Sequence, residues 1–239
     1  MSILAHKLRR TPQQQVGGGG DEVNVAYTSF KTVAGNTSAT KTFTSVDIGT
    51  PDADRYVIVA LQWVNSFSSV SLSSATINGV SASVTTSRTA LYSTGHAVFF
   101  AKVPTGTSVT VVANLSGTTL SNYTENMAVY TINTPTLRLE RNLSIYNGST
   151  NSIAFTDPAN DFDVATNEFL IGNITISGVR EDTSVDELTE DTYQTNATGT
   201  NFYASYNNNT ASSQLIAPTF SWGGDTTNAL ASIYKFSYS

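Results

Sequence analysis

Residues 55–64 read RYVIVALQWV, and apolar side chains occupy both alternating faces of this segment. In a strand, one face would carry Val57, Val59, Leu61 and Trp63, and the other face would carry Tyr56 and Ile58. A strand that is apolar on both faces is typical of the centre of a sheet that is covered on both sides. We therefore predict that 55–64 is a buried central strand around which the fold is built.

Strand-like segments separated by turn residues continue on both sides of this stretch. They are 75–84, 96–103, 108–115 and 125–132, followed by 138–146, 168–177, 213–222 and 229–239. Asn78-Gly79 is the strongest short hairpin signal, because a type I′ turn needs a positive φ at both of its central positions. The turn PTGT at 104–107 predicts a second hairpin, between 96–103 and 108–115.

No long segment follows the 3.6-residue period of a helix, and 184–193 is the only candidate for a short helix. Turns recur at intervals typical of two packed sheets. We therefore predict an all-β fold, an antiparallel β-sandwich or jelly-roll-like arrangement, over residues 21–239. A sub-boundary is expected near 134–137.

Two details refine this prediction. Pro218 lacks an N–H, which should place its strand at an edge or a bulge. A run from an aspartate into an apolar strand occurs at 46–61 and again at 162–177. We interpret this similarity as the same local arrangement of approach and strand used twice, and only secondarily as a sign of duplication.

The composition narrows the chemistry that is available. The 239 residues carry a net charge of −6 at pH 7, with a pI near 4.8. There is no cysteine, which excludes disulfides, thiolate chemistry and Cys-based zinc sites. No apolar run is long enough for a membrane-spanning helix, so no membrane partner is expected.

The first twenty residues, MSILAHKLRRTPQQQVGGGG, form an extended N-terminal arm by prediction. They hold three of the 12 Lys and Arg residues, next to a small apolar patch. We expect the arm to bind the acidic surface of a partner, through Ile3, Leu4, His6, Lys7, Arg9 and Arg10. The alternative is a tail without a function. The remaining basic residues are scattered, so nucleic acid is not an expected partner.

Catalytic motifs are missing from the sequence. His96 is the only histidine outside the arm, and no G-x-S-x-G nucleophile elbow occurs. We expect His96 to be a half-exposed residue at a strand end rather than a catalytic base. No pair of carboxylates suits a glycosidase in a strand context. The sequence therefore predicts a protein that is not an enzyme and uses no cofactor.

The acidic residues do not predict a metal site. A cluster near 181–191 contains Glu181, Asp182, Asp186, Glu187, Glu190 and Asp191. Its spacing matches no EF-hand loop, and it contains no glycine, so we expect a solvated loop or short helix. Asp52 and Asp54 should cap a turn and pair locally with Arg55.

Aromatic and amide side chains gather in NFYASYNNNTASS at 201–213. A loop with these residues is one hypothesis for a glycan or ligand site, formed by Phe202, Tyr203, Tyr206, Asn207 and Asn208. The competing interpretation is that these rings belong to the core or to cross-strand pairs.

Three stretches together resemble structural proteins of tailed-bacteriophage virions. They are TFTSVDIGTPDADRYVIVALQW (42–63), ATINGVSA (75–82) and HAVFFAKVPTGTSVTVVANLSG (96–117). The shared pattern is an approach strand ending in I-G-T, a short A-D-R, a Val-rich strand, an N-G hairpin and a P-T-G-T turn. The resemblance covers about residues 40–132 and is vague beyond Pro135, where 179–211 looks like a variable insertion.

The resemblance implies a non-enzymatic β-sandwich protein on the exterior of a phage particle. It would be a capsid decoration or head-fibre-like protein, or a tail-associated protein, docked through the arm. Its partners would be major capsid or tail proteins, in a homo-oligomer or in many symmetric copies. The alternative function is a carbohydrate- or receptor-binding adhesion module, with a host surface glycan as partner.

Overall fold

The computed structural model describes residues 23–36, 38–64, 70–85, 88–89, 94–116, 123–156, 161–178, 180, 182–196, 199–208, 210–224 and 227–239. Every regular element among these residues is a β-strand, and all strand pairs are antiparallel, so the all-β prediction is confirmed. The predicted arm lies outside the described residues.

The first strands of the chain form two sheets that we call the N-terminal sandwich. The strands are β1 (Ala26–Asn36), β2 (Thr40–Asp47), β3 (Arg55–Val64), β4 (Ser71–Ile77), β5 (Val80–Ser81), β6 (Ser83–Val84), β7 (Arg88–Thr89), β8 (Thr94–Lys102), β9 (Ser108–Ser116) and β10 (Tyr123–Asn133). The inner sheet has the order β1-β10-β3-β8-β6, with β7 also paired to β8, and the outer sheet has the order β2-β9-β4-β5.

The remaining strands form the C-terminal sandwich. They are β11 (Leu137–Thr150), β12 (Ser152–Ala154), β13 (Phe162–Val164), β14 (Glu168–Ser177), β15 (Ser184–Val185), β16 (Thr189–Asn196), β17 (Gly199–Asn207), β18 (Gln214–Ile216), β19 (Thr219–Ser221) and β20 (Thr227–Tyr238). Its inner sheet has the order β11-β20-β14-β17-β16. Its outer layer consists of two small sheets, β12-β19-β15 and β13-β18.

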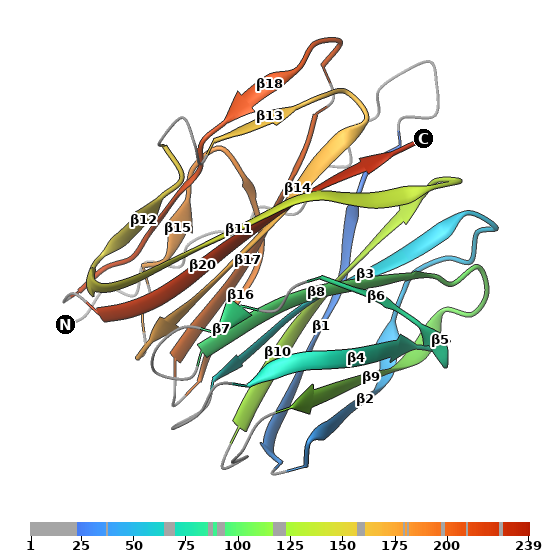
Figure 1. Cartoon of the computed structure of the whole chain (residues 1–239), viewed down its shortest axis with the longest axis horizontal. Coiled ribbons are helices and arrows are strands. Elements are labelled where there is room, and N and C mark those ends of the chain that lie inside the picture. The colour runs from blue at the N-terminus through green and yellow to red at the C-terminus, as the bar shows by residue number, and fades with distance from the viewer. Residues whose placement is uncertain are drawn as a thin grey trace, which may run out of the picture.

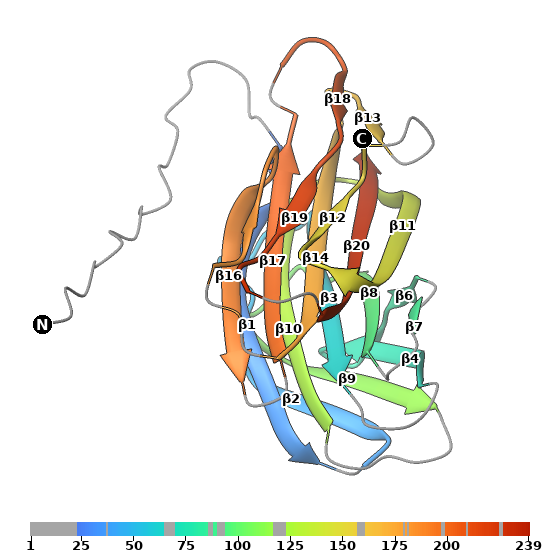
Figure 2. The same ribbon diagram turned by 90° about the vertical axis from the view of Figure 1, so that its left-hand side faces the viewer.

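The two inner sheets pack face to face, so the molecule has four layers. Figure 1 shows β2, β4 and β9 on the opposite side of the molecule from β12, β13 and β18. Figure 2, turned by 90°, again places β2 and β9 at one end and β13 and β18 at the other. Each sandwich has its own apolar core, and a third core joins the inner sheets through side chains such as Ile58, Tyr130, Phe169 and Tyr234.

The central-strand prediction is confirmed. β3 spans 55–64 and lies between β10 and β8 in the inner sheet. Val57, Val59, Leu61 and Trp63 are buried in the core of the N-terminal sandwich. Ile58 and Tyr56, on the other face, pack in the core between the inner sheets. The strand is apolar on both faces because both faces of its sheet are covered.

The two sandwiches repeat one strand order. In each inner sheet, the first strand of the sandwich pairs with the last strand, the last strand pairs with a central strand, and the central strand pairs with one further strand. These orders are β1-β10-β3-β8 in one sheet and β11-β20-β14-β17 in the other. The outer layers also correspond, as β2-β9-β4 and β12-β19-β15. The echo between 46–61 and 162–177 leads into β3 and β14, which hold equivalent places. The repetition therefore covers the strand order of both sandwiches and is not limited to one local arrangement.

Arg55 explains the turn motifs on which the resemblance rests. Its guanidinium is buried and donates to six backbone carbonyl oxygens, those of Ile48, Gly49, Thr50, Val103, Thr105 and Gly106, at 2.7–3.2 Å. The I-G-T and P-T-G-T segments are thus held together by one side chain. Burial lowers the pKa of Arg55, and the nearby charge of Asp52 opposes this shift.

The predicted second hairpin is wrong, whereas the first is confirmed. Asn78 and Gly79 both have positive φ and connect the paired strands β4 and β5. In contrast, β8 pairs with β3 and β9 pairs with β2 and β4, so these two strands lie in different sheets. The turn at 104–107 carries the chain between layers, and Arg55 satisfies the carbonyls of Thr105 and Gly106 in it.

Pro218 divides the outer layer of the C-terminal sandwich. It lies between β18 and β19, so it interrupts the strand instead of placing it at an edge or a bulge. The carboxylates of Glu187 and Asp186 accept hydrogen bonds from the backbone N–H groups of Ala217 and Thr219, on either side of the proline. The candidate helix at 184–193 is not formed, because β15 and the start of β16 occupy it.

Candidate functional site

The segment proposed as a ligand loop is largely the strand β17. Phe202 is fully buried in the core of the C-terminal sandwich, and Tyr203 is fully buried between the inner sheets. Neither ring can stack on a sugar, which corrects the sequence-based hypothesis for these two residues. Tyr206 is half-buried and packs against the C-terminal core. The alternation of a strand sends these neighbouring rings to opposite faces.

Asn207 and Asn208 bind backbone of the protein itself. The Asn207 side chain accepts a hydrogen bond from the Val25 N–H at 2.9 Å and donates to the Val25 carbonyl at 3.1 Å. The buried Asn208 amide donates to the carbonyls of Val164 and Ser212 at 2.6 and 2.9 Å. These two asparagines therefore fix strand ends by binding backbone groups.

His96 is fully buried, which corrects the expectation of a half-exposed residue. It lies near the start of β8 and faces the inner sheet of the C-terminal sandwich, which no signal in its own segment indicated. One ring nitrogen is 2.9 Å from the Ser232 hydroxyl, and the other is 2.9 Å from the Thr175 hydroxyl. Burial lowers the pKa of His96 to about 3, so the ring is neutral at pH 7.

A second buried ionisable group lies inside the N-terminal sandwich. Lys41 on β2 and Glu125 on β10 form an ion pair of 2.8 Å between layers, and both side chains are fully buried. Burial raises the pKa of Glu125, and the bond to Lys41 opposes that shift. The pair joins the outer and inner sheets and opens onto no described cavity.

The acidic cluster near 181–191 serves the scaffold where it is described. Asp186 and Glu187 brace the backbone around Pro218, as described above. Asp191 accepts hydrogen bonds from the Tyr130 hydroxyl at 2.9 Å and from Ser205 at 3.1 Å. Burial raises the pKa of Asp191 to about 7, and these bonds only partly oppose the shift. No group of three residues suited to hold a metal ion occurs in the described part of the chain.

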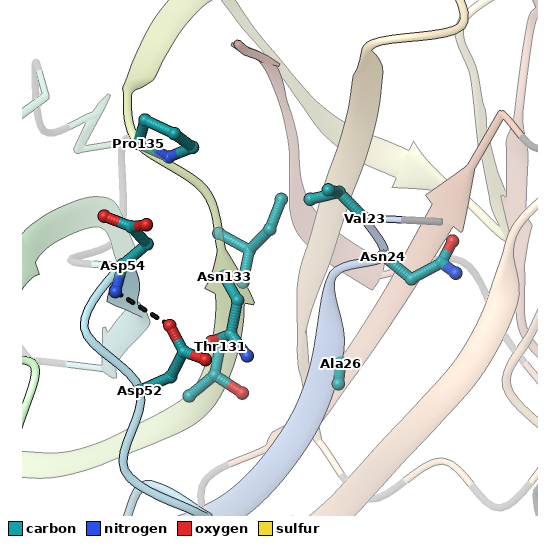
Figure 3. A pocket seen from close by; sticks show the side chains of 9 residues that line it. Val23, Asn24, Ala26, Asp52, Asp54, Thr131, Asn133 and Pro135 are labelled. Atoms are coloured by element: carbon teal, nitrogen blue, oxygen red, sulfur yellow. Dashed lines mark hydrogen bonds between the residues drawn. The ribbon is translucent and has the colours of Figure 1, made fainter. Parts of the chain in front are cut away.

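A hollow lies where the described chain begins. An open groove of about 510 Å³ has one wall formed by the start of β1 and another formed by the turn before β3 and the end of β10. Its lining includes Val23 and Ala26 on one side and Asp52, Asp54 and Pro135 on the other, as Figure 3 shows. This groove is the candidate site, because it adjoins the root of the arm.

The carboxylates of the groove are already partly bonded. Asp52 accepts a hydrogen bond from the Asp54 N–H at 2.7 Å, which is the turn cap expected from the sequence. Asp54 forms an ion pair of 2.7 Å with Lys102 rather than with Arg55. The groove therefore has carboxylate oxygens on one wall, and these are hydrogen-bond acceptors.

The root of the arm, residues 23–25, is fixed to the C-terminal sandwich directly before it enters β1 of the N-terminal sandwich. Val25 is held by Asn207 of β17, and the carbonyl of Val23 accepts a hydrogen bond from the Tyr238 hydroxyl of β20 at 2.9 Å. The arm residues Ile3, Leu4, His6, Lys7, Arg9 and Arg10 lie outside the described residues. Sequence reasoning missed the groove because its walls meet only through tertiary structure, as in the pairing of Ala26 with Thr131.

Comparison with known proteins adds no relative. No protein-family model, no curated protein and no solved structure matches this chain. In the part of the chain that is described, no helix has the length and apolar character to cross a membrane.

Proposed function

We propose that the protein is a non-enzymatic structural component on the exterior of a bacteriophage virion, docked through residues 1–20. The observation that carries the proposal is the use of the buried ionisable side chains. Arg55 binds turns, Lys41 pairs with Glu125 across two layers, and His96 joins two inner sheets. A scaffold in which such groups serve cohesion suits a particle protein better than an enzyme.

The charge distribution supports a docking role for the arm. Residues 21–239 contain nine Lys and Arg against 18 Asp and Glu, a net charge of −9, whereas the arm carries three basic residues and no acidic one. An acidic body is repelled by an acidic partner surface. A basic arm of twenty residues spans at most about 70 Å when extended, so it can bind the acidic surface while the acidic body stays at a distance from it.

The rooted start of β1 fits this proposal. Because Val23 and Val25 are bonded to the C-terminal sandwich, a pull on the arm is transmitted to both sandwiches. The alternative function, a glycan- or receptor-binding module, loses Phe202 and Tyr203 as contact residues because both are buried. It would therefore need another surface.

Deletion of residues 1–20 tests the proposal. The truncated protein should unfold at the same urea concentration as the full chain and should be absent from purified particles by mass spectrometry. Each exposed charge contact contributes only about 0–1 kcal/mol, so many copies on one surface would be needed. Attachment of the truncated protein at the full-length level would refute the docking role.

Two sets of substitutions separate the contributions of charge and apolar contact. Replacing Lys7, Arg9 and Arg10 with Glu should weaken attachment in a salt-dependent way. Replacing Ile3 and Leu4 with Ser should weaken it with little dependence on salt. The full chain must also be found in particles at a fixed copy number, since its absence from them would end the virion proposal altogether.

A further inference from the structure

The interface between the inner sheets changes character along its length. One end is aromatic: the rings of Phe169 and Phe236 stack at 5.1 Å, and Phe100 meets Phe236 edge-on at 5.6 Å. The other end is polar and fully buried, and its side chains are Gln62, His96, Asn126, Asn173, Thr175, Asn201 and Ser232. Buried polar groups need partners, so this polar end requires a full account of its hydrogen bonds.

Three asparagines of the polar end have side-chain atoms without a partner in the protein. Neither the Oδ1 nor the Nδ2 atom of Asn173 is hydrogen-bonded. The Nδ2 atoms of Asn126 and Asn201 are also unpaired. Their oxygens are occupied, because Thr32 donates to Asn126 at 2.8 Å and Thr175 donates to Asn201 at 3.0 Å. The two amino groups are therefore held in place as donors.

The three asparagines belong to one cluster. Asn201 is the cross-strand partner of Thr175, whose hydroxyl also lies 3.0 Å from Gln62, and Asn126 is the cross-strand partner of Gln62. Asn173 precedes Thr175 by two residues and so shares its face of β14.

Tyr203 links Asn173 to the opposite sheet. It is the cross-strand partner of Asn173, and its hydroxyl donates to the Asn126 carbonyl at 2.9 Å. Unpaired atoms of both inner sheets are thus gathered at one end of the interface.

We infer that the polar end of the interface binds internal water, which bridges the Asn173 amide to the amino groups of Asn126 and Asn201. A buried amide without a partner is costly, whereas a buried water typically makes about three hydrogen bonds to such groups. The neighbouring residues on the inner sheet of the N-terminal sandwich, Ala60 and Ala128, have small side chains that offer no hydrogen-bond partner of their own. The ligand class is water, and the inference is independent of the virion proposal.

The structural repeat supports a specific role for Asn173. β14 corresponds to β3, and pairing places Asn173 where β3 has Ala60: both follow Ile171 and Ile58, respectively, by two residues on the face toward the interface. One inner sheet therefore contributes an amide where the other contributes a methyl group. Water bound there hydrogen-bonds both sheets together at the polar end of the interface.

Magnetic relaxation dispersion of isotopically labelled water counts long-lived internal waters and tests the inference. The variant Asn173→Leu should lose at least one such water and should unfold at a lower urea concentration. Asn208→Leu is the matched control, since the Asn208 amide is bonded to protein atoms. It should lower the urea midpoint and leave the water count unchanged.

An unchanged water count in Asn173→Leu overturns the inference, whatever the midpoint. If that variant does not fold, a high-resolution crystal structure of the unaltered chain decides. Water within hydrogen-bond distance of the Asn173 side chain supports the inference. An Asn173 amide bonded only to protein atoms, or to nothing, overturns it.

Discussion

The N-terminal and C-terminal sandwiches share a strand order but hold it together with different side chains. The first has a largely aliphatic core that also buries the Lys41–Glu125 ion pair. The second contains a larger share of aromatic rings, among them Phe155, Phe202 and Phe220, which contact one another. The position equivalent to Glu125 is Ala229, which pairs with Ile176 as Glu125 pairs with Trp63. The alternation of buried faces sets the topology, and the chemistry of the core is free to vary within it.

The outer layers differ in a related way. β2 and β9 are continuous, whereas the corresponding strands of the C-terminal sandwich are broken into β12 with β13 and β18 with β19. A broken outer sheet loses ladder hydrogen bonds, and aromatic burial beneath it offsets that loss. We therefore expect the loss of one partner of the ion pair to destabilise the N-terminal sandwich most, and the loss of a ring to matter more in the C-terminal sandwich.

The largest effect is expected from breaking the ion pair. Glu125→Leu leaves the ammonium of Lys41 buried without its carboxylate and should cost about 3–5 kcal/mol of unfolding free energy. The double variant Lys41→Met/Glu125→Leu removes both charges and should lie within about 1–2 kcal/mol of the unaltered protein. Urea unfolding measures both. A double variant as unstable as the single one would mean that the pair itself supplies net stability.

The next effect concerns the pH dependence of stability, because the contributions of His96 and Asp191 change with pH in opposite directions. The pKa of His96 is about 3 in the folded protein and about 6.5 when unfolded, so its contribution to stability falls as the pH drops below 6.5. The pKa of Asp191 is about 7 when folded and 3.8 when exposed, so its contribution falls as the pH rises from 4 to 7. Between pH 4 and 6.5 the two slopes compensate.

Asp191→Asn removes the contribution of Asp191, so the stability of this variant should fall with decreasing pH as the contribution of His96 predicts. The stability of the variant relative to the unaltered protein should rise by about 1.4 kcal/mol for each pH unit between 4.5 and 6. Denaturant titrations at several pH values measure this difference, in which the contributions of other carboxylates cancel. A difference that does not change with pH would show that the Asp191 carboxyl titrates normally in the folded protein.

A smaller effect is expected from removing one ring of the aromatic core. Phe220 meets Phe155 and Phe202 edge-on at 6.3 and 6.1 Å. Phe220→Leu loses both ring contacts and should cost about 1–3 kcal/mol. Phe43→Leu, at a buried site of the N-terminal sandwich, is the matched control and should cost less, because Phe43 makes no ring contact with the described residues. Equal losses would contradict the contrast between the two cores.

Local patterns predicted elements well but could not assign layers. The apolar run 55–64 gave β3 with its two faces, and Asn78-Gly79 gave a correct hairpin. The PTGT turn indicated a reversal of the chain but not whether the next strand joins the same sheet. The turn is held by hydrogen bonds from Arg55, which lies far from it in the sequence. The burial of His96 and Tyr203 depends on the second sandwich covering the first, and no signal in their own segments reports that.

The smallest effect tests the break in the outer layer of the C-terminal sandwich. The carboxylate of Asp186 accepts the N–H of Thr219, directly after Pro218, and the site is exposed. Asp186→Ala removes this acceptor, and water replaces it only in part, so the loss should be about 0.5–1.5 kcal/mol. Asp186→Asn keeps an oxygen acceptor of the same shape and should retain most of that stability. Hydrogen exchange at the Thr219 amide should accelerate in Asp186→Ala and much less in Asp186→Asn. Exchange in Asp186→Ala at the rate of the unaltered protein would mean that the carboxylate does not brace the break, and that the core and the pairing with β12 and β15 hold β19 in place.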